Sequence, residues 1–278
     1  MLSKRQQCMN AVEQYKEIFQ CPICASGMQL SELGQLQCEN RHAFDIAKQG
    51  YLNLLQKPMQ SMYSKELFEA RFEVISSGLY DEVQQAIAKK LKPGFILDTG
   101  CGEGSHLTRI IGGRDDVYGV GIDIAKEGIL AAAKFNSGSI WTVGDLANSP
   151  FQANSFETIL NFLSPANYEE FKRLLKPGGQ LIKVIPGEHY LKELRMQAFA
   201  GSEKESYNNE QTISRFEEQL ANVQVEHVNF TKALTPELAQ KLVLMTPMGW
   251  HVEGKEQIEL PEITIDLHIL VGQLEGER

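Results

Sequence analysis

The chain has 278 residues, of which 42% are hydrophobic and 23% are charged, a composition that argues against general disorder and for one or two packed domains. It contains no run of about 18 apolar residues and no apolar leader at its N-terminus, so we expect a cytoplasmic protein with no membrane partner. The net charge of −9 argues against nucleic acid as a partner, but residues 1–92 hold 11 Lys and Arg against 10 Asp and Glu, so the acidity lies in the remainder.

The first predicted element is a metal-binding ribbon. Cys21 and Cys24 are separated by two residues, Cys38 and His42 by three, and thirteen residues lie between the two pairs. Structural zinc sites use four thiolate or imidazole ligands, commonly supplied in such pairs from tight turns. We therefore predict a closed, structural zinc site at Cys21, Cys24, Cys38 and His42; the alternative is reduced cysteines scattered by chance.

A mixture of basic and aromatic residues accompanies and follows the last of these ligands. Arg41, Lys48 and Lys57 are interleaved with Phe44 and Tyr51. Cations can meet phosphates while rings stack on bases, which makes Arg41, Lys48, Tyr51 and Lys57 candidates for RNA binding. The sequence equally allows the rings to pack against the zinc turns while the lysines are solvated.

A polar stretch at 56–66 predicts a linker, and helices are expected from about Lys65 and within 80–91. From Pro93 onward, short β-rich runs at 95–100, 117–123, 139–144, 156–162 and 180–186 alternate with helical stretches such as 127–135 and 167–175. This alternation predicts an α/β fold, a doubly wound, mostly parallel sheet with helices on both faces. Ligands of such folds lie at the carboxyl ends of the strands.

A glycine-rich loop follows the first of these strands. Gly100, Gly102 and Gly104 would let the backbone turn tightly and approach a ligand closely. The loop lacks the third glycine of a dinucleotide fingerprint, because position 105 is Ser. Asp98 would repel a pyrophosphate, whereas it suits a ligand that carries an ammonium group and a sulfonium.

Two further acidic residues follow the next strands. Asp123 lies 21 residues beyond Gly102, where a carboxylate can accept both hydroxyls of a ribose. Asp145 could bind the exocyclic amine of an adenine, with Leu146 supplying a backbone contact. Together with the glycine loop, these residues indicate a nucleoside ligand.

Residues 98–104, Asp123, Asp145 and the stretch 174–186 resemble class I S-adenosylmethionine-dependent methyltransferases. From about Phe19 onward the chain is similar to bacterial ribosomal RNA (guanine-N1-)-methyltransferases of the RlmA type. That resemblance rests on the four predicted zinc ligands and on the stretches 42–55, 69–80 and 242–251. It implies a Rossmann-like methyltransferase domain, S-adenosylmethionine as cofactor, structural zinc, a guanine in hairpin 35 of 23S ribosomal RNA as substrate, and a homodimer.

The resemblance also implies domain bounds and cofactor contacts. Residues 1–18 would be an N-terminal extension, 19–56 a zinc-binding RNA-recognition domain, 57–92 a linker with connecting helices, and 93–278 the methyltransferase domain. The implied cofactor contacts are Tyr80, Gly102 and Glu103. A family histidine after the fifth strand falls on Tyr190 or on the preceding His189, and the sequence leaves this open.

Methylation at guanine N1 requires removal of a proton, and the sequence assigns no base for that step. Asn161 to Pro165 could frame a flipped base or simply end a strand; Trp250 and Met248 could stack on the base or lie in the core. Two other functions stay open: a small-molecule methyltransferase with a structural ribbon, and a non-enzymatic zinc module that binds RNA.

Overall fold

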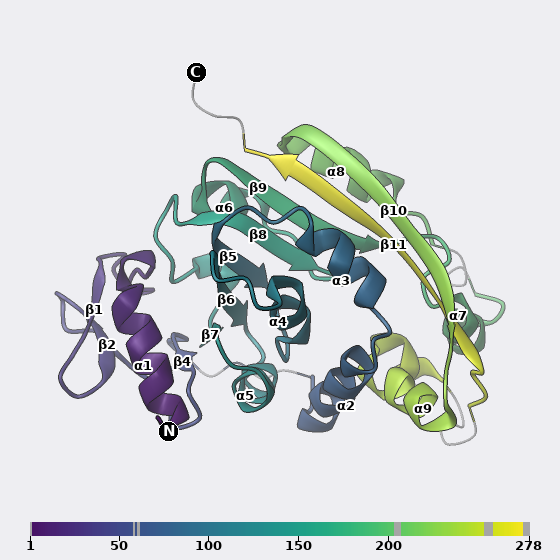
Figure 1. Cartoon of the computed structure of the whole chain (residues 1–278), viewed down its shortest axis with the longest axis horizontal. Coiled ribbons are helices and arrows are strands. Elements are labelled where there is room, and N and C mark those ends of the chain that lie inside the picture. Colours follow the sequence, from purple (N-terminus) through teal and green to yellow (C-terminus); the bar gives the residue numbers. More distant parts are fainter. Residues whose placement is uncertain (1, 58, 60–61, 203–206, 253–257, 275–278) are drawn as a thin grey trace.

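An eight-stranded sheet forms the centre of the molecule in the computed structural model (Figure 1). The structure describes residues 2–57, 59, 62–202, 207–252 and 258–274. The strand order is β10-β11-β9-β8-β5-β6-β7-β4, parallel from β4 to β9 and antiparallel at β9, β11 and β10. The bounds of these strands are β4 (Leu52–Asn53), β5 (Gly94–Thr99), β6 (Val117–Asp123), β7 (Ile140–Val143), β8 (Phe156–Phe162), β9 (Leu175–Pro186), β10 (Ala221–Ala233) and β11 (Glu262–Gln273).

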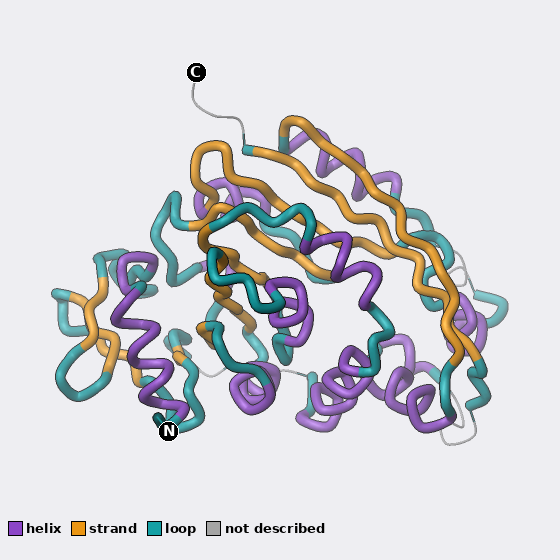
Figure 2. Tube along the Cα trace, in the orientation of Figure 1, coloured by secondary structure: helices purple, strands orange, loops and turns teal. Residues whose placement is uncertain are grey.

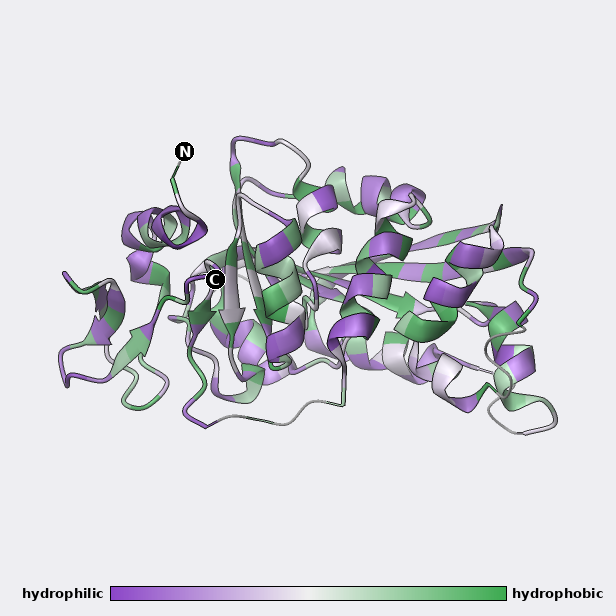
Figure 3. Ribbon diagram, turned by 90° about the horizontal axis from the view of Figure 1, so that it is seen from below, coloured by the Kyte–Doolittle hydropathy of each residue, from purple (hydrophilic) through white to green (hydrophobic). Residues whose placement is uncertain are grey.

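Helices cover both faces of this sheet (Figure 2). One hydrophobic cluster contains residues of α3, α4, α5 and α9, and the other contains residues of α6 and α8. Seen from below, these helices are banded with hydrophilic and hydrophobic residues, as expected where one face packs on a sheet (Figure 3). The helices are α2 (Lys65–Ser76), α3 (Asp81–Ala88), α4 (Ser105–Ile111), α5 (Lys126–Phe135), α6 (Tyr168–Leu174), α7 (Lys192–Phe199), α8 (Glu210–Gln219) and α9 (Pro236–Met245). The predicted doubly wound α/β fold is confirmed.

The predicted ribbon is a three-stranded antiparallel sheet made of β1 (Met28–Leu30), β2 (Gln35–Cys38) and β3 (Ala43–Asp45). Met28, Leu36 and Phe44 are buried in it, and they are continuous with one of the two clusters of the large sheet. The chain then passes into β4, which pairs with β7 at the edge of the large sheet. The segment predicted as the end of the ribbon is thus part of the large sheet.

The N-terminal extension forms α1 (Lys4–Gln14), which lies beside the ribbon in Figure 1. Ser3 caps this helix through a capping box with Gln6. The ammonium of Lys4 donates to the carbonyl of Lys134 at 2.7 Å, and Arg5 Nε donates to the carbonyl of Ile46 at 3.1 Å. The extension therefore contacts both the ribbon and the large sheet's α5.

Some elements were not identified from the sequence. The helices expected near Lys65 and within 80–91 are α2 and α3, and the five expected strands are β5 to β9. The sequence did not predict α1, α7, α8, α9 or the long antiparallel pair β10 and β11. Positions 58, 60 and 61 of the predicted linker lie outside the described residues. Of the described helices, none combines the length and apolar character that crossing a bilayer requires.

Candidate metal centre and active site

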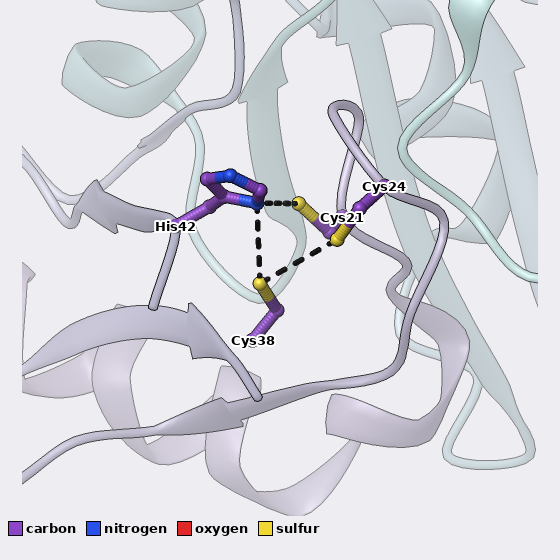
Figure 4. A group of neighbouring side chains, drawn as sticks. All are labelled: Cys21, Cys24, Cys38 and His42. Atoms are coloured by element: carbon purple, nitrogen blue, oxygen red, sulfur yellow. Dashed lines mark hydrogen bonds between the residues drawn. The ribbon is translucent and has the colours of Figure 1, made fainter. Parts of the chain in front are cut away.

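The four predicted zinc ligands converge on one point (Figure 4). Their ligand atoms all lie within 4.8 Å of one another. Nδ1 of His42 is 3.5 Å from the sulfurs of both Cys21 and Cys38, and the sulfurs of Cys24 and Cys38 are 3.7 Å apart. Tetrahedral zinc with Zn–S near 2.3 Å and Zn–N near 2.0–2.1 Å requires edges of about 3.5–3.8 Å. The donor types and these three distances therefore fit tetrahedral zinc.

Two matching turns present these ligands. Ala25, just after the first pair, and Arg41, between the members of the second pair, have φ values of 59° and 64°, in the left-handed region. The backbone N–H groups of these residues donate to the carbonyls of Cys21 and Cys38, at 2.8 and 2.9 Å. Each turn thus closes on the first ligand of its pair.

The glycine loop joins β5 to α4 as predicted. The N–H of Gly102 donates to Asp123 Oδ2 at 2.8 Å, which ties the loop to the end of β6. Gly104 has φ +77°, and a Cβ there would lie 2.4 Å from the ring of Trp141. Gly100 has φ +73°, and a Cβ there would lie 2.1 Å from Ser164 Oγ. The loop therefore requires glycine at both positions, for conformation and for space.

A cavity of about 600 Å³ opens beside this loop, at the carboxyl ends of the parallel strands. Its lining includes four predicted site residues, Tyr80, Gly102, Asp123 and Tyr190, together with Met248. The hydroxyls of Tyr80 and Tyr190 are hydrogen-bonded at 2.7 Å. His189 lines a different hollow with His227 and His268. Of the two candidates for the family histidine, Tyr190 is the one in the cavity.

Two buried carboxyl groups lie in and just before the loop. Asp98 Oδ1 has no hydrogen-bond partner in the described part of the chain, and burial raises the pKa of Asp98 to about 8. Such an oxygen suits a partner that arrives with a positively charged ligand. Glu103 is buried, with Oε2 3.0 Å from Arg71 Nε in an ion pair. Its carboxylate is thus already engaged by a protein cation.

Asp145 and Leu146 follow β7 and belong to a short turn on the ribbon side. Asp145 Oδ1 accepts the N–H of Ala147 at 2.8 Å. Asp145 lines a smaller hollow with Lys57, and the nearby Asn148 donates to the carbonyl of Pro22 at 2.9 Å. This turn therefore lies near the first zinc turn, and neither residue belongs to the lining of the main cavity.

The residues predicted to frame a base differ in their exposure to solvent. Asn161 is buried, and its Nδ2 donates to Thr99 Oγ1 at 3.0 Å and to the carbonyl of Pro165 at 3.1 Å. Asn161 therefore holds the end of β8 in place. Trp250 is 40% exposed, and its ring centroid is 5.9 Å from that of Tyr63, which lines the cavity.

The candidate RNA-binding residues also differ in their exposure to solvent. Arg41, Lys48 and Lys57 are exposed. Tyr51 is only 5% exposed and belongs to a hydrophobic cluster of the large sheet. Tyr51 therefore packs in the large sheet rather than against the zinc turns, and in this arrangement its ring offers no free face to a base.

Among the charged residues of the cavity that sequence reasoning missed are Arg71 and Lys183. Arg71 lies on the apolar stripe of α2, one helical turn from Leu67 and Phe68, where a cation is unusual. Lys183 interrupts the apolar run of β9. The signal in both cases is a charged residue at a position where the local pattern calls for an apolar one.

Comparisons with families and curated proteins agree with this arrangement. The family described as "RlmA, N-terminal", a zinc ribbon, matches residues 19–65, and "Methyltransferase domain" matches residues 96–179. A Bacillus subtilis protein, YxjB, named as a candidate 23S rRNA (guanine-N(1)-)-methyltransferase, is 38% identical over 92% of this chain and 96% of its own length. The Streptomyces fradiae 23S rRNA (guanine(748)-N(1))-methyltransferase is 30% identical over 90% of this chain and 95% of its own length.

Solved structures share the fold at low identity. A Haemonchus contortus phosphoethanolamine N-methyltransferase 2 in complex with S-adenosyl-L-methionine is 15% identical, with a TM-score of 0.50, over 78% of this chain and 59% of that chain. A methyltransferase complex with the Haloferax volcanii Trm112 activator has the same identity and TM-score over 78% of this chain and 99% of that chain. These likenesses concern the class I methyltransferase fold alone.

Proposed function

The chain belongs to the family of 23S rRNA (guanine-N1-)-methyltransferases, and we propose that it methylates N1 of a guanine in hairpin 35 of 23S ribosomal RNA, with S-adenosylmethionine as methyl donor. It is a methyltransferase that acts on ribosomal RNA. The observation that supports methyl transfer at this site is the cavity at the carboxyl ends of the strands, which joins the glycine loop and Asp123 to the end of β8.

The donor would be held by residues around the glycine loop. S-adenosylmethionine supplies, when bound, a methyl carbon activated by a sulfonium. Asp98, with its unpartnered Oδ1, would face the ammonium group, and Asp123 would accept the ribose hydroxyls. Gly100, Gly102 and Gly104 let the backbone approach, while Tyr80 and Tyr190 close the cavity from the side. We retain Glu103, Asp145 and Leu146 as further contacts near this site.

The target guanine has to be placed in line with the methyl carbon, in a site that excludes water. Because N1 lies on the base-pairing edge, the base must leave its stack or lie in an open loop. The segment from Asn161 to Pro165 would border this base at the end of β8, with Met248 in the cavity wall and Trp250 nearby.

The ribbon would hold RNA for this reaction. We propose that Cys21, Cys24, Cys38 and His42 bind one structural zinc, because their ligand atoms fit tetrahedral coordination. The exposed Arg41, Lys48 and Lys57 would meet phosphates of the hairpin. We also propose the domain bounds 19–56 and 93–278, a cytoplasmic location and a homodimer.

The test is to incubate the protein with radiolabelled S-adenosylmethionine and protein-free 23S ribosomal RNA, then to map the label. Methylation at N1 blocks base pairing, so reverse transcriptase should stop at one guanine of hairpin 35. RNA in which this hairpin is replaced by an unrelated stem serves as control and should stay unlabelled. Label at another site or on another atom would contradict the proposal, and label transferred only to small molecules would favour a small-molecule methyltransferase.

A further inference from the structure

Lys183 is a buried cation in the wall of the proposed methyl-transfer cavity. It lies on β9 and is 5% exposed, and it lines the same cavity as Gly102 and Asp123. Its ammonium donates to Asn161 Oδ1 and, at 3.0 Å, to the carbonyl of Ser164. A lysine in such a place is costly to bury, which suggests a chemical role.

The contacts of Lys183 place its nitrogen beside the glycine loop. Asn161 is hydrogen-bonded to Thr99, which is the last residue of β5 and directly precedes the glycine loop. Ser164 Oγ would be 2.1 Å from a Cβ at Gly100, so the residue whose carbonyl accepts from Lys183 lies directly against the first glycine. The nitrogen is thus fixed at the end of β8, where the methyl carbon and the base have to meet.

In its neutral form, the amine nitrogen of Lys183 carries two hydrogens and one lone pair. The nitrogen can donate these two hydrogens to the oxygens of Asn161 and Ser164, which leaves the lone pair free. Because two acceptors fix the orientation of the group, this lone pair has a defined direction. An amine held in this way can accept a proton from a group that enters the cavity.

Burial also favours the neutral form, since it lowers the pKa of Lys183 to about 8. On the neighbouring strands, Glu157 of β8 is paired with Lys176 and Asp266 of β11 is paired with His227. The titratable groups that share the cavity wall are Tyr63, Arg71 of α2, Tyr80, His106 of α4, Asp123 of β6, Tyr190, Arg195 of α7 and Tyr207. A base that titrates near the working pH is the most effective kind.

We propose that the amine of Lys183 takes the N1 proton of the target guanine during methyl transfer, with Asn161 as its positioning residue. The proposal rests on the proposed function. The N1–H bond breaks and its proton passes to Lys183 Nζ, which becomes an ammonium. The electron pair left on N1 forms the new bond to the methyl carbon. The carbon–sulfur bond breaks with its electron pair kept by sulfur, so the sulfonium ends as a neutral thioether. The ammonium then releases its proton to water.

The test measures single-turnover methylation of 23S ribosomal RNA from pH 6 to 9.5 for the parent and for Lys183→Met. The parent rate should rise with pH and level off above about pH 8, as the amine loses its proton. Lys183→Met should be slower by roughly 100- to 10,000-fold, the usual contribution of a general base, and its rate should keep rising through the whole range. Calorimetry should find S-adenosylmethionine affinity unchanged, which shows that the variant is folded. Lys176→Met, on the same strand but at its far end, is the matched control and should behave like the parent.

Two further variants separate a base from a mere positive charge. Lys183→Arg keeps the charge but cannot act as a base, so it should be as slow as Lys183→Met. Lys183→Ala should be partly rescued by small primary amines, because they fit the space left by the side chain. An active Lys183→Arg, or a Lys183→Met variant with the parent's rate and pH profile, would overturn the inference while leaving the proposed function intact. A parent that leaves guanine N1 unmethylated would overturn both.

Discussion

The ribbon and the methyl-transfer cavity are ordered by different means. The ribbon has strands of three and four residues and a small interior, and its turns converge on four ligand atoms within 4.8 Å of one another. The cavity is backed by an eight-stranded sheet with hydrophobic clusters on both faces. In the first region the proposed zinc would supplement a small core, whereas in the second a large core surrounds buried ionisable groups such as Asp98 and Lys183. A substitution that disrupts one region should therefore leave the structure and ligand binding of the other unchanged.

The largest effect is expected from removal of a zinc ligand. Structural zinc contributes about 10–16 kcal/mol of binding free energy in small domains, so Cys38→Ala should abolish tight zinc binding and unfold the turns around it. Ribosomal RNA methylation should disappear, while S-adenosylmethionine affinity should stay within about twofold, because the sites are independent. Metal analysis, hydrogen exchange and calorimetry measure the three quantities. Cys8→Ala, a buried cysteine outside the ligand set, is the control and should keep its zinc.

Purified parent protein without zinc would contradict this account of the ribbon. A large loss of cofactor affinity in Cys38→Ala would contradict the independence of the two regions. It would mean that contacts between the regions, such as the hydrogen bond from Asn148 to the carbonyl of Pro22, transmit the state of the zinc turn to the cofactor site.

A smaller effect is expected at Asp123, in the other region. Its carboxylate already accepts the N–H groups of Gly102 and Ala125, at 2.8 and 2.7 Å. Asp123→Ala should therefore weaken S-adenosylmethionine binding by roughly 1–3 kcal/mol, because it removes the acceptor for the ribose hydroxyls and loosens the loop. Zinc content should not change. Unaltered affinity by calorimetry would place the ribose elsewhere.

A pH dependence should sharpen the role of Asp98. Its pKa is raised to about 8 by burial, so at pH 7 the free protein mostly holds this carboxyl protonated. A positively charged ligand group favours the carboxylate, so binding should release a proton, and affinity should rise by up to about tenfold between pH 6 and 7. Calorimetry in buffers of different ionisation enthalpy measures the proton release. Asp98→Asn should abolish both the release and this pH dependence; release of a proton by that variant would assign it to another group.

Sequence reasoning succeeded where spacing along the chain alone defines a site. The four zinc ligands were predicted because each pair lies within one turn, and the glycine loop because its residues are contiguous. Lys183 could not be assigned in this way, because its meeting with Asn161 depends on the pairing of β8 with β9. The burial of Tyr51 likewise depends on β4 joining the large sheet. The pair β10 and β11 had a usable signal in the sequence, since apolar and polar residues alternate at 228–231 of β10 and at 263–269 of β11.

The most direct test of the division between the two regions is RNA affinity across a salt series for Arg41→Gln/Lys48→Gln. If the ribbon holds the hairpin, the double variant should bind ribosomal RNA more weakly, and its slope of log affinity against log salt should flatten by about 0.7–0.9 for each phosphate that is no longer neutralised. Its S-adenosylmethionine affinity should equal the parent's. The matched control is Lys89→Gln/Lys126→Gln, which removes two exposed cations outside the ribbon and should leave the slope unchanged. A double variant that binds and methylates the RNA like the parent at every salt concentration would contradict the account, because the ribbon would then serve folding or dimerisation rather than RNA recognition.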